Sequence, residues 1–147
     1  MQLTKHTDFG LRTLIYLALN PDRRVSTAEI AQAFGVPQNH LSKVVGQLAH
    51  NGVVQTYRGK HGGTTLAMPT ETIRVGAIVR QLEGEQEMIN CARPVCPAIP
   101  ACRLIEAMQQ AKDACLHVLD TYTLADMVDN RRQELSVLLA MPAPQKH

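Results

Sequence analysis

The spacing of apolar and polar positions predicts three helices in the first fifty residues. Between residues 7 and 19 the apolar side chains recur at intervals of three and four, as on one buried face of a helix, and Asn20-Pro21 ends it. A second, short helix is expected around AEIAQAF. Ser26 is followed three residues later by Glu29, the pattern of a capping box, and Gly35 stands where a C-terminal cap is expected.

The third predicted helix completes a helix-turn-helix. Pro37 suits its first turn, QNHLSKVVGQLAH continues it, and Asn51-Gly52 stops it. Its inward-facing residues are Leu41, Val44, Val45 and Leu48. Two capped helices joined by a tight glycine turn are a helix-turn-helix candidate, and the alternative is a helical pair that packs only on itself.

A hairpin is predicted next, at about residues 53–68. In VVQTYRGKHGGTTLAM, β-branched and aromatic residues lie on both sides of a glycine-containing turn. A hairpin directly after a helix-turn-helix is a wing. Residues 72–75 are then expected to be extended, and residues 76–83 to form a brief helix.

A long helix is predicted after an irregular, proline-rich stretch. Its apolar residues recur at helical intervals and are Leu104, Met108, Ala111, Cys115 and Leu119. Further apolar residues give it a second face to bury, so a partner subunit is expected. A last helix is expected over 124–140, and residues 141–147 should form a flexible tail.

These elements predict a mostly α-helical fold with a small β wing. A winged helix-turn-helix domain is expected over residues 1–83, followed by a loop over 84–102 and by a dimerisation helix and C-terminal helix over 103–140. The length of 147 residues and the apolar content of 45% suit one compact chain.

Charge is distributed unevenly, although the net charge is only +2. Residues 1–68 carry seven Lys and Arg against three Asp and Glu, whereas residues 69–147 carry eight against ten. A cationic first part is compatible with binding to phosphate, and equally with an accidental asymmetry on a solvated surface. Three Tyr, two Phe and no Trp are too few for the stacking platforms of single-strand binders. The helix-turn-helix, the wing and the cationic bias together make double-stranded DNA the expected partner.

No membrane segment is predicted, because the longest apolar run, Leu14 to Leu19, is too short to cross a bilayer and no signal peptide is evident. A cytoplasmic location is expected. Enzymatic chemistry is not indicated either: the sequence has no glycine-rich nucleotide loop and no paired acid and base residues. The chain is therefore expected not to be an enzyme.

Eight side chains are candidates for DNA contact. Early residues of the second helix of a helix-turn-helix reach base edges in the major groove, and wing residues reach the minor groove or phosphates. The candidates in the helix are Gln38, Asn39, His40, Ser42 and Lys43, and those in the wing are Arg58, Lys60 and His61.

Three of the four cysteines lie in CARPVCPAIPAC, at Cys91, Cys96 and Cys102. Soft thiolates select zinc, copper(I) or iron–sulfur clusters, and reducing cytosol disfavours disulfides. The paired cysteines of a zinc ribbon are absent. An opportunistic zinc site and a surface loop with incidental thiols are the alternatives. Cys115 would lie about 20 Å further along a continuous helix, so it is expected to be a buried core thiol.

Three parts of the chain resemble one family of regulators. The opening MQLTKHTDFGLRTLIYLA, the block NHLSKVVGQLAHNGVVQTYRGKHGG and the loop ending in PACRL are similar to the winged-helix iron–sulfur regulators of the NsrR and IscR family, and YTLAD after the long helix favours the NsrR type. The resemblance covers nearly the whole chain. It implies a homodimeric repressor that senses nitric oxide through an iron–sulfur cluster, with nitrosylation releasing operator DNA.

The resemblance also implies the ligands of that cluster. One 2Fe–2S or 4Fe–4S cluster would be held in the 84–102 loop by Cys91, Cys96 and Cys102, with Asp8 of the partner subunit as a fourth ligand. IscR-like members have a histidine where this chain has Ile105. Asp8 also suits a structural role in the first turn of a helix. The alternatives are a regulator that senses redox state or cluster supply and, in another class, an iron–sulfur electron carrier or a structural zinc protein.

Overall fold

The computed structural model describes residues 2–84 and 87–140, and the tail predicted for residues 141–147 lies outside these ranges. The described chain is mostly helical with a two-stranded antiparallel wing, which confirms the predicted fold class. Its helices are α1 (Lys5–Leu19), α2 (Thr27–Phe34), α3 (Gln38–His50), α4 (Val75–Glu83), α5 (Leu104–Asp120), α6 (Leu124–Val128) and α7 (Arg132–Ala140). The strands are β1 (Val54–Tyr57) and β2 (Gly63–Leu66), and the short 3-10 helices are η1 (Thr70–Thr72), η2 (Ile99–Ala101) and η3 (Asp129–Arg131).

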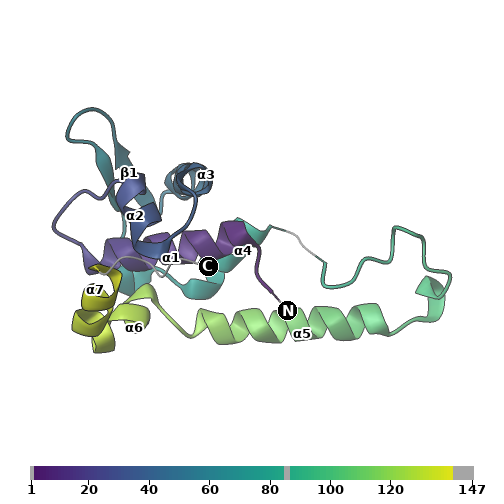
Figure 1. Ribbon diagram of the computed structural model, residues 1–147. Helices are drawn as coiled ribbons and strands as arrows, with labels where there is room; N and C mark the ends of the chain where they lie inside the picture. The colour runs from purple at the N-terminus through teal and green to yellow at the C-terminus, as the bar shows by residue number, and fades with distance from the viewer. Residues whose placement is uncertain (1, 85–86, 141–147) are drawn as a thin grey trace.

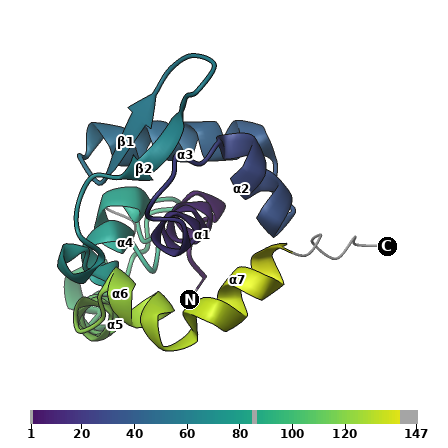
Figure 2. The same ribbon diagram turned by 90° about the vertical axis from the view of Figure 1, so that its left-hand side faces the viewer.

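The chain forms a head, residues 2–83 and 124–140, and an arm, residues 87–120 (Figure 1). Helix α1 runs through the centre of the head with the other helices around it (Figure 2). Only one buried face was expected for α1, but α6 covers a second side, so most of its circumference is buried. Gly10 lets the side chain of Leu82 in α4 lie directly on the α1 backbone. Because burying a Leu or Ile contributes about 1.5–3 kcal/mol, this shared core holds the head together.

Caps define the ends of the first helices, and the two caps predicted for α2 are confirmed. Helix α1 begins slightly earlier than predicted, because Thr4 Oγ1 accepts a 3.3 Å hydrogen bond from the amide of Thr7. Ser26 Oγ accepts one of 3.1 Å from the amide of Glu29, and Gly35 ends α2 with a left-handed φ of 62°. These local signals fix where each helix starts and stops.

Two local details differ from the sequence-based expectation. The Glu29 carboxylate accepts hydrogen bonds from Tyr16 and Arg23 and not from the Ser26 amide, so the capping box is half formed. Pro37 precedes α3 as its N-cap and is not in the first turn, because its ψ of 127° is extended.

The C-terminal segment is broken where one helix over 124–140 was predicted. Helices α6 and α7 are separated by η3. Leu124 and Val128 of α6 are buried against the core, and beyond the turn Arg132 Nη1 donates a 2.7 Å hydrogen bond to the carbonyl of Ala18 at the end of α1. The break lets both short helices pack on the head.

The wing is fixed at its base. Strands β1 and β2 pair with Val54 opposite Leu66 and Tyr57 opposite Gly63. The segment before α2 joins them, because Val25 and Thr64 exchange two backbone hydrogen bonds of 3.0 and 2.8 Å.

The arm consists of the cysteine-containing loop and α5, which run beside each other (Figure 1). No residue of α5 is buried in the single chain, and Leu104, Ile105 and Val118 are 46%, 39% and 59% exposed. Within the ranges that the structure describes, none of the helices has both the length and the apolar character needed to span a membrane.

Candidate functional site

The N-terminal half of α3 presents polar side chains to solvent. Leu41, Val44 and Val45 turn toward the core, so the residues between them point outward. The hydroxyl of Ser42 donates a 3.1 Å hydrogen bond to the carbonyl of Gln38, one turn earlier. All five candidates in this helix are exposed: Gln38, Asn39, His40, Ser42 and Lys43.

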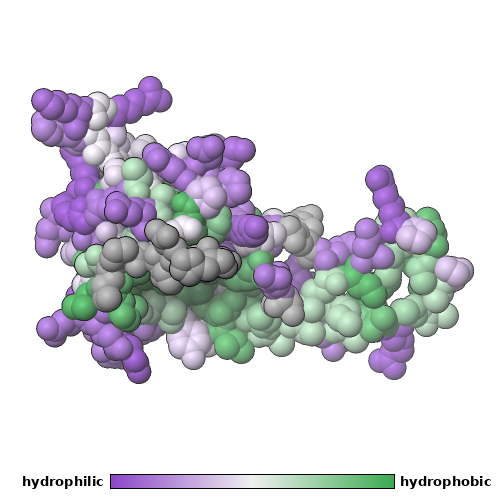
Figure 3. Space-filling model, viewed as in Figure 1, coloured by the Kyte–Doolittle hydropathy of each residue, from purple (hydrophilic) through white to green (hydrophobic). Residues whose placement is uncertain are grey.

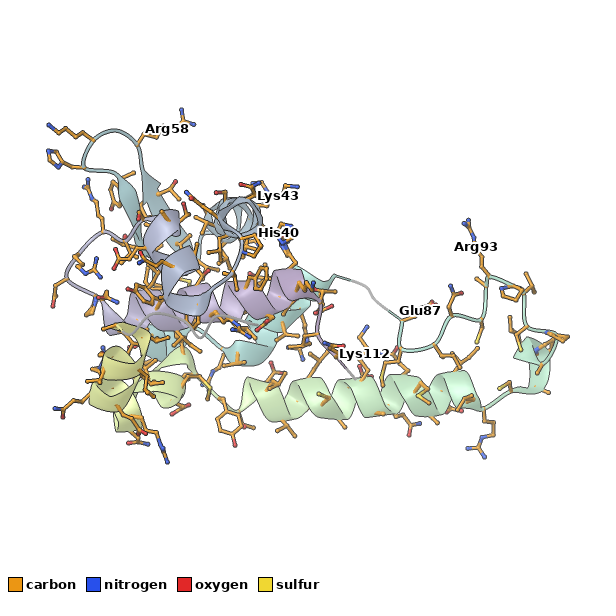
Figure 4. The ribbon with its side chains drawn as sticks, in the orientation of Figure 1. His40, Lys43, Arg58, Glu87, Arg93 and Lys112 are labelled. Atoms are coloured by element: carbon orange, nitrogen blue, oxygen red, sulfur yellow. The ribbon has the colours of Figure 1, made fainter. Side chains whose placement is uncertain are left out.

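The wing carries the other three candidates, Arg58, Lys60 and His61, and all three are exposed. Figure 4 shows Arg58 on the wing and His40 and Lys43 on α3, all on the side of the head away from α5. Residues 30–70, which include α3 and the whole wing, contain no Asp or Glu. The surface formed by α3 and the wing therefore has cationic side chains with no carboxylate from its own segment to neutralise them.

Arg24 supports this surface and was missed by sequence reasoning. Its guanidinium carbon lies 3.7 Å from the centroid of the Tyr57 ring, and its Nη1 donates a 3.1 Å hydrogen bond to the carbonyl of His61. A cation over an aromatic face is attracted by the ring's electron density. No local signal marks Arg24, since its wing partners lie more than thirty residues further along the chain.

The cysteine-containing loop is organised by backbone turns. The amide of Cys96 donates a 3.0 Å hydrogen bond to the carbonyl of Cys91, and Asn90 Oδ1 accepts from the amides of Ala92 and Arg93 at 3.0 and 3.1 Å. Cys102 Sγ accepts from the amide of Leu104 at 3.4 Å. All three thiols are half-buried. The loop thus holds its cysteines by short-range hydrogen bonds.

The Cys91 thiol has a raised pKa. Desolvation is the main cause, and negative charge on Cys96, Cys102 and Glu87 adds to it. Negative charge on these neighbouring groups would therefore disfavour the Cys91 thiolate. A bound cation would reverse that effect, because it stabilises thiolates.

The donors of the loop fit a soft metal or an iron–sulfur cluster in their chemistry. Three cysteines on one loop, none of them in a disulfide, are the ligands that such groups prefer. Across residues 2–84 and 87–140, however, no three His, Cys, Asp or Glu side chains are gathered closely enough to hold a metal ion.

Asp8 and Cys115 are both separate from this loop. Asp8 lies in the first turn of α1, where its Oδ1 accepts a 2.7 Å hydrogen bond from Arg12 Nε. Arg93, between the first two cysteines of the loop, lies on the arm, whereas α1 lies in the head (Figure 4). Cys115 was expected to be a buried core thiol, but it is only half-buried, since no residue of α5 is buried in the single chain.

The surface of the molecule is divided in character. Hydrophilic residues gather over the wing and α3, whereas apolar residues gather along the arm (Figure 3). Apolar surface of this kind is typical of a protein–protein interface. The surfaces of the head and the arm thus differ in chemical character.

Known proteins are similar to this chain over most of its length. Residues 3–130 match the Rrf2 family, described as iron-dependent transcriptional regulators. IscR from T. potens is 26% identical, with a TM-score of 0.70 over 91% of this chain and 90% of that protein. The oxidized form of CymR from Staphylococcus aureus is 30% identical, with a TM-score of 0.66 over 86% and 95% of the two chains. CymR from B. subtilis, described as its global cysteine regulator, is 27% identical, with a TM-score of 0.66 over 88% and 98%. The winged head and a family match that spans most of the sequence show that this chain belongs to the Rrf2 family of transcriptional regulators.

Proposed function

We propose that this regulator represses transcription by binding operator DNA as a homodimer, with α3 in the major groove and the wing on the adjacent backbone. Members of the family are transcription regulators rather than enzymes, bind DNA and are typically dimers. The observation that carries the proposal is the exposed surface of α3 and the wing, which is cationic and free of Asp and Glu between residues 30 and 70.

The arm supplies the dimer contact. Helix α5 leaves Leu104, Ile105 and Val118 exposed, and a second copy of α5 would cover such a face. Two heads read one face of a duplex only when their recognition helices are about 34–36 Å apart. The position of each head on its arm therefore controls the affinity for the operator.

The signal is nitric oxide, acting at the cysteine-containing loop. Cys91, Cys96 and Cys102, with Asp8 of the partner subunit, would hold a 2Fe–2S or 4Fe–4S cluster, whose iron is a strong binding centre for nitric oxide. Within one chain, Asp8 is held by Arg12, so ligation would require this ion pair to open or to be shared. Asp8 thus has two alternative partners, one in its own head and one on the opposite arm.

The test is isolation without oxygen, with iron and sulfide counting, followed by nitric oxide titration while operator binding is monitored. We expect iron and sulfide in the wild-type protein and loss of DNA binding as nitric oxide is added. Equal operator affinity before and after nitric oxide would contradict nitric oxide sensing. Protein that contains zinc and no iron would instead indicate a structural metal.

Asp8 is tested in the same assay. Asp8→Ala should retain less cluster and respond at lower nitric oxide doses, whereas the matched variant Asp22→Ala, at an exposed position before α2, should behave as wild type. If Asp8→Ala and wild type have equal cluster content and an equal nitric oxide response, Asp8 is not a cluster ligand and has only a structural role in α1.

A second candidate signal is redox state or cluster supply. The iron-dependent description of the family and the similarity to IscR support it. Release of DNA on iron withdrawal or mild oxidation, with no response to nitric oxide, would favour this candidate.

A further inference from the structure

The C-terminal end of α5 is joined to α4 by a two-pronged ion pair. Arg80 Nη1 lies 2.6 Å from Asp120 Oδ1, and Arg80 Nη2 lies 2.7 Å from Asp120 Oδ2. Two parallel hydrogen bonds between a guanidinium and a carboxylate fix the relative orientation of the two groups as well as the distance between them. The contact therefore constrains the angle at which α5 leaves the head.

Gly76, one turn before Arg80 in α4, makes room for this contact. A Cβ at Gly76 would lie 2.9 Å from the backbone nitrogen of Asp120 and closer still to its carboxylate. The end of α5 thus packs directly on the α4 backbone.

Asp120 is also in an unusual place for an acidic residue. It is the last residue of α5, where the partial negative charge of the helix end disfavours a carboxylate. Pairing with Arg80 offsets this, which indicates that Asp120 serves the contact between the two helices rather than the stability of α5.

The backbone beside the ion pair is fixed as well. The amide of Val75 donates a 3.0 Å hydrogen bond to the carbonyl of Tyr122, and the amide of Leu124 donates one of 2.8 Å to the carbonyl of Ile73. These bonds attach the chain after α5 to the start of α4 and the residues just before it. The backbone bonds and the ion pair are thus two separate points of attachment, and together they set an orientation.

We propose that Gly76, Arg80 and Asp120 form a junction that sets the angle between head and arm, and hence the spacing of the two recognition helices in the dimer. The three are positioning residues for operator recognition and do not touch DNA. The proposal rests on the proposed binding of operator DNA by a dimer. Since α5 is about 25 Å long, a change of about 10° at its base would move its far end by about 4 Å, enough to misplace one head relative to the other.

The test uses a duplex that wild-type protein selects from a random DNA pool. Versions of it carry one or two extra base pairs between the half-sites, and a further version carries one half-site only. For Asp120→Asn and Arg80→Gln we expect binding to the complete duplex to weaken about five- to tenfold, with a shifted spacing preference. Binding to the single half-site should change by less than about twofold, because the head is intact.

Two controls show whether the effect is specific to the pairing of Arg80 with Asp120. The exchanged pair, Arg80→Asp with Asp120→Arg, should restore much of the wild-type preference for spacing. Arg131→Gln breaks an exposed ion pair with Glu134 in the η3–α7 segment, 3.3 Å in length, and should leave affinity and spacing preference unchanged.

The possible outcomes distinguish failure of the proposed junction from failure of the proposed DNA binding. If Asp120→Asn and Arg80→Gln keep the wild-type spacing preference, or lose affinity equally for the complete and half-site duplexes, the junction does not set spacing and the proposal is overturned. If wild-type protein selects no duplex at all, the proposed DNA binding itself is wrong.

Discussion

Arg24, in the segment before α2, packs against the wing, with Tyr57 under its guanidinium and the His61 carbonyl as its acceptor. Because both contacts are internal, Arg24 should serve the wing rather than DNA phosphate. We expect Arg24→Gln to weaken DNA binding about fivefold, the equivalent of one cation–π contact. The slope of log affinity against log salt should stay close to wild type, whereas Lys60→Gln should reduce its magnitude by about one.

Tyr57 provides the matched comparison for Arg24. Tyr57→Leu removes the aromatic face and should reproduce the loss of affinity, while Tyr57→Phe keeps the ring and should not. If Arg24→Gln reduces the slope of log affinity against log salt as much as Lys60→Gln does, Arg24 contacts a phosphate.

Glu29 joins α1, the following turn and α2 through Tyr16 and Arg23. Its pKa is lowered, mainly by the hydrogen bonds from Arg23, while burial opposes this, so the charged form stabilises the fold. That stability is present above the ordinary Glu pKa of about 4.3 and is lost as the pH falls through the lower, folded value. We expect Glu29→Gln to reduce the free energy of unfolding by about 0.5–1 kcal/mol at pH 7, allowing for its partial exposure.

Urea unfolding at pH 7 and at pH 3 measures this effect. The difference between wild type and Glu29→Gln should shrink at the lower pH, because the stability that depends on the Glu29 charge declines below the ordinary Glu pKa. A difference of the same size at both values would mean that the charge of Glu29 contributes nothing.

Helix α3 contains a glycine that its packing does not need. Gly46 is exposed, and nothing lies within 4 Å of the place where its Cβ would be. Gly46→Ala should therefore raise the free energy of unfolding by about 0.5–1 kcal/mol, through the better helix propensity of Ala. Gly76→Ala in α4 should lower it, because the new methyl group would meet Asp120. Thermal unfolding of the two variants checks both signs, and destabilisation by Gly46→Ala would contradict this account.

Helices with local stop and start signals were predictable from sequence, and contacts between distant segments were not. Ser26 and Gly35 cap the two ends of α2 through contacts with residues close in sequence. The ends of this helix could therefore be predicted without information about tertiary structure. The break at η3 depends on packing against α1, and Arg80 pairs with a residue forty positions further along the chain, Asp120. The exposed polar row of α3 follows from helical periodicity, whereas the support of the wing by Arg24 does not.

The assembled protein should depend on α5 for its dimer. Val118 on α5 and Val137 on α7 are equally exposed in the single chain, at 59% and 60%. Val118→Asp places a charge in the proposed dimer contact and should raise the dimer dissociation constant by at least about tenfold. Val137→Asp should not. Sedimentation across a range of concentrations distinguishes them, and an equal effect of both substitutions would place the dimer contact elsewhere.

The bond from Arg132 to Ala18, with the burial of Leu124 and Val128, makes the head a discontinuous unit that closes only when both ends of the chain meet. The arm is in effect an insertion within it. During synthesis, the last apolar side of α1 stays uncovered until residues more than a hundred positions downstream have been made. Because these contacts are distant in sequence, the final step of folding is expected to be slow. The same topology would allow an insertion such as the arm to change in length among relatives while the DNA-reading surface keeps its shape.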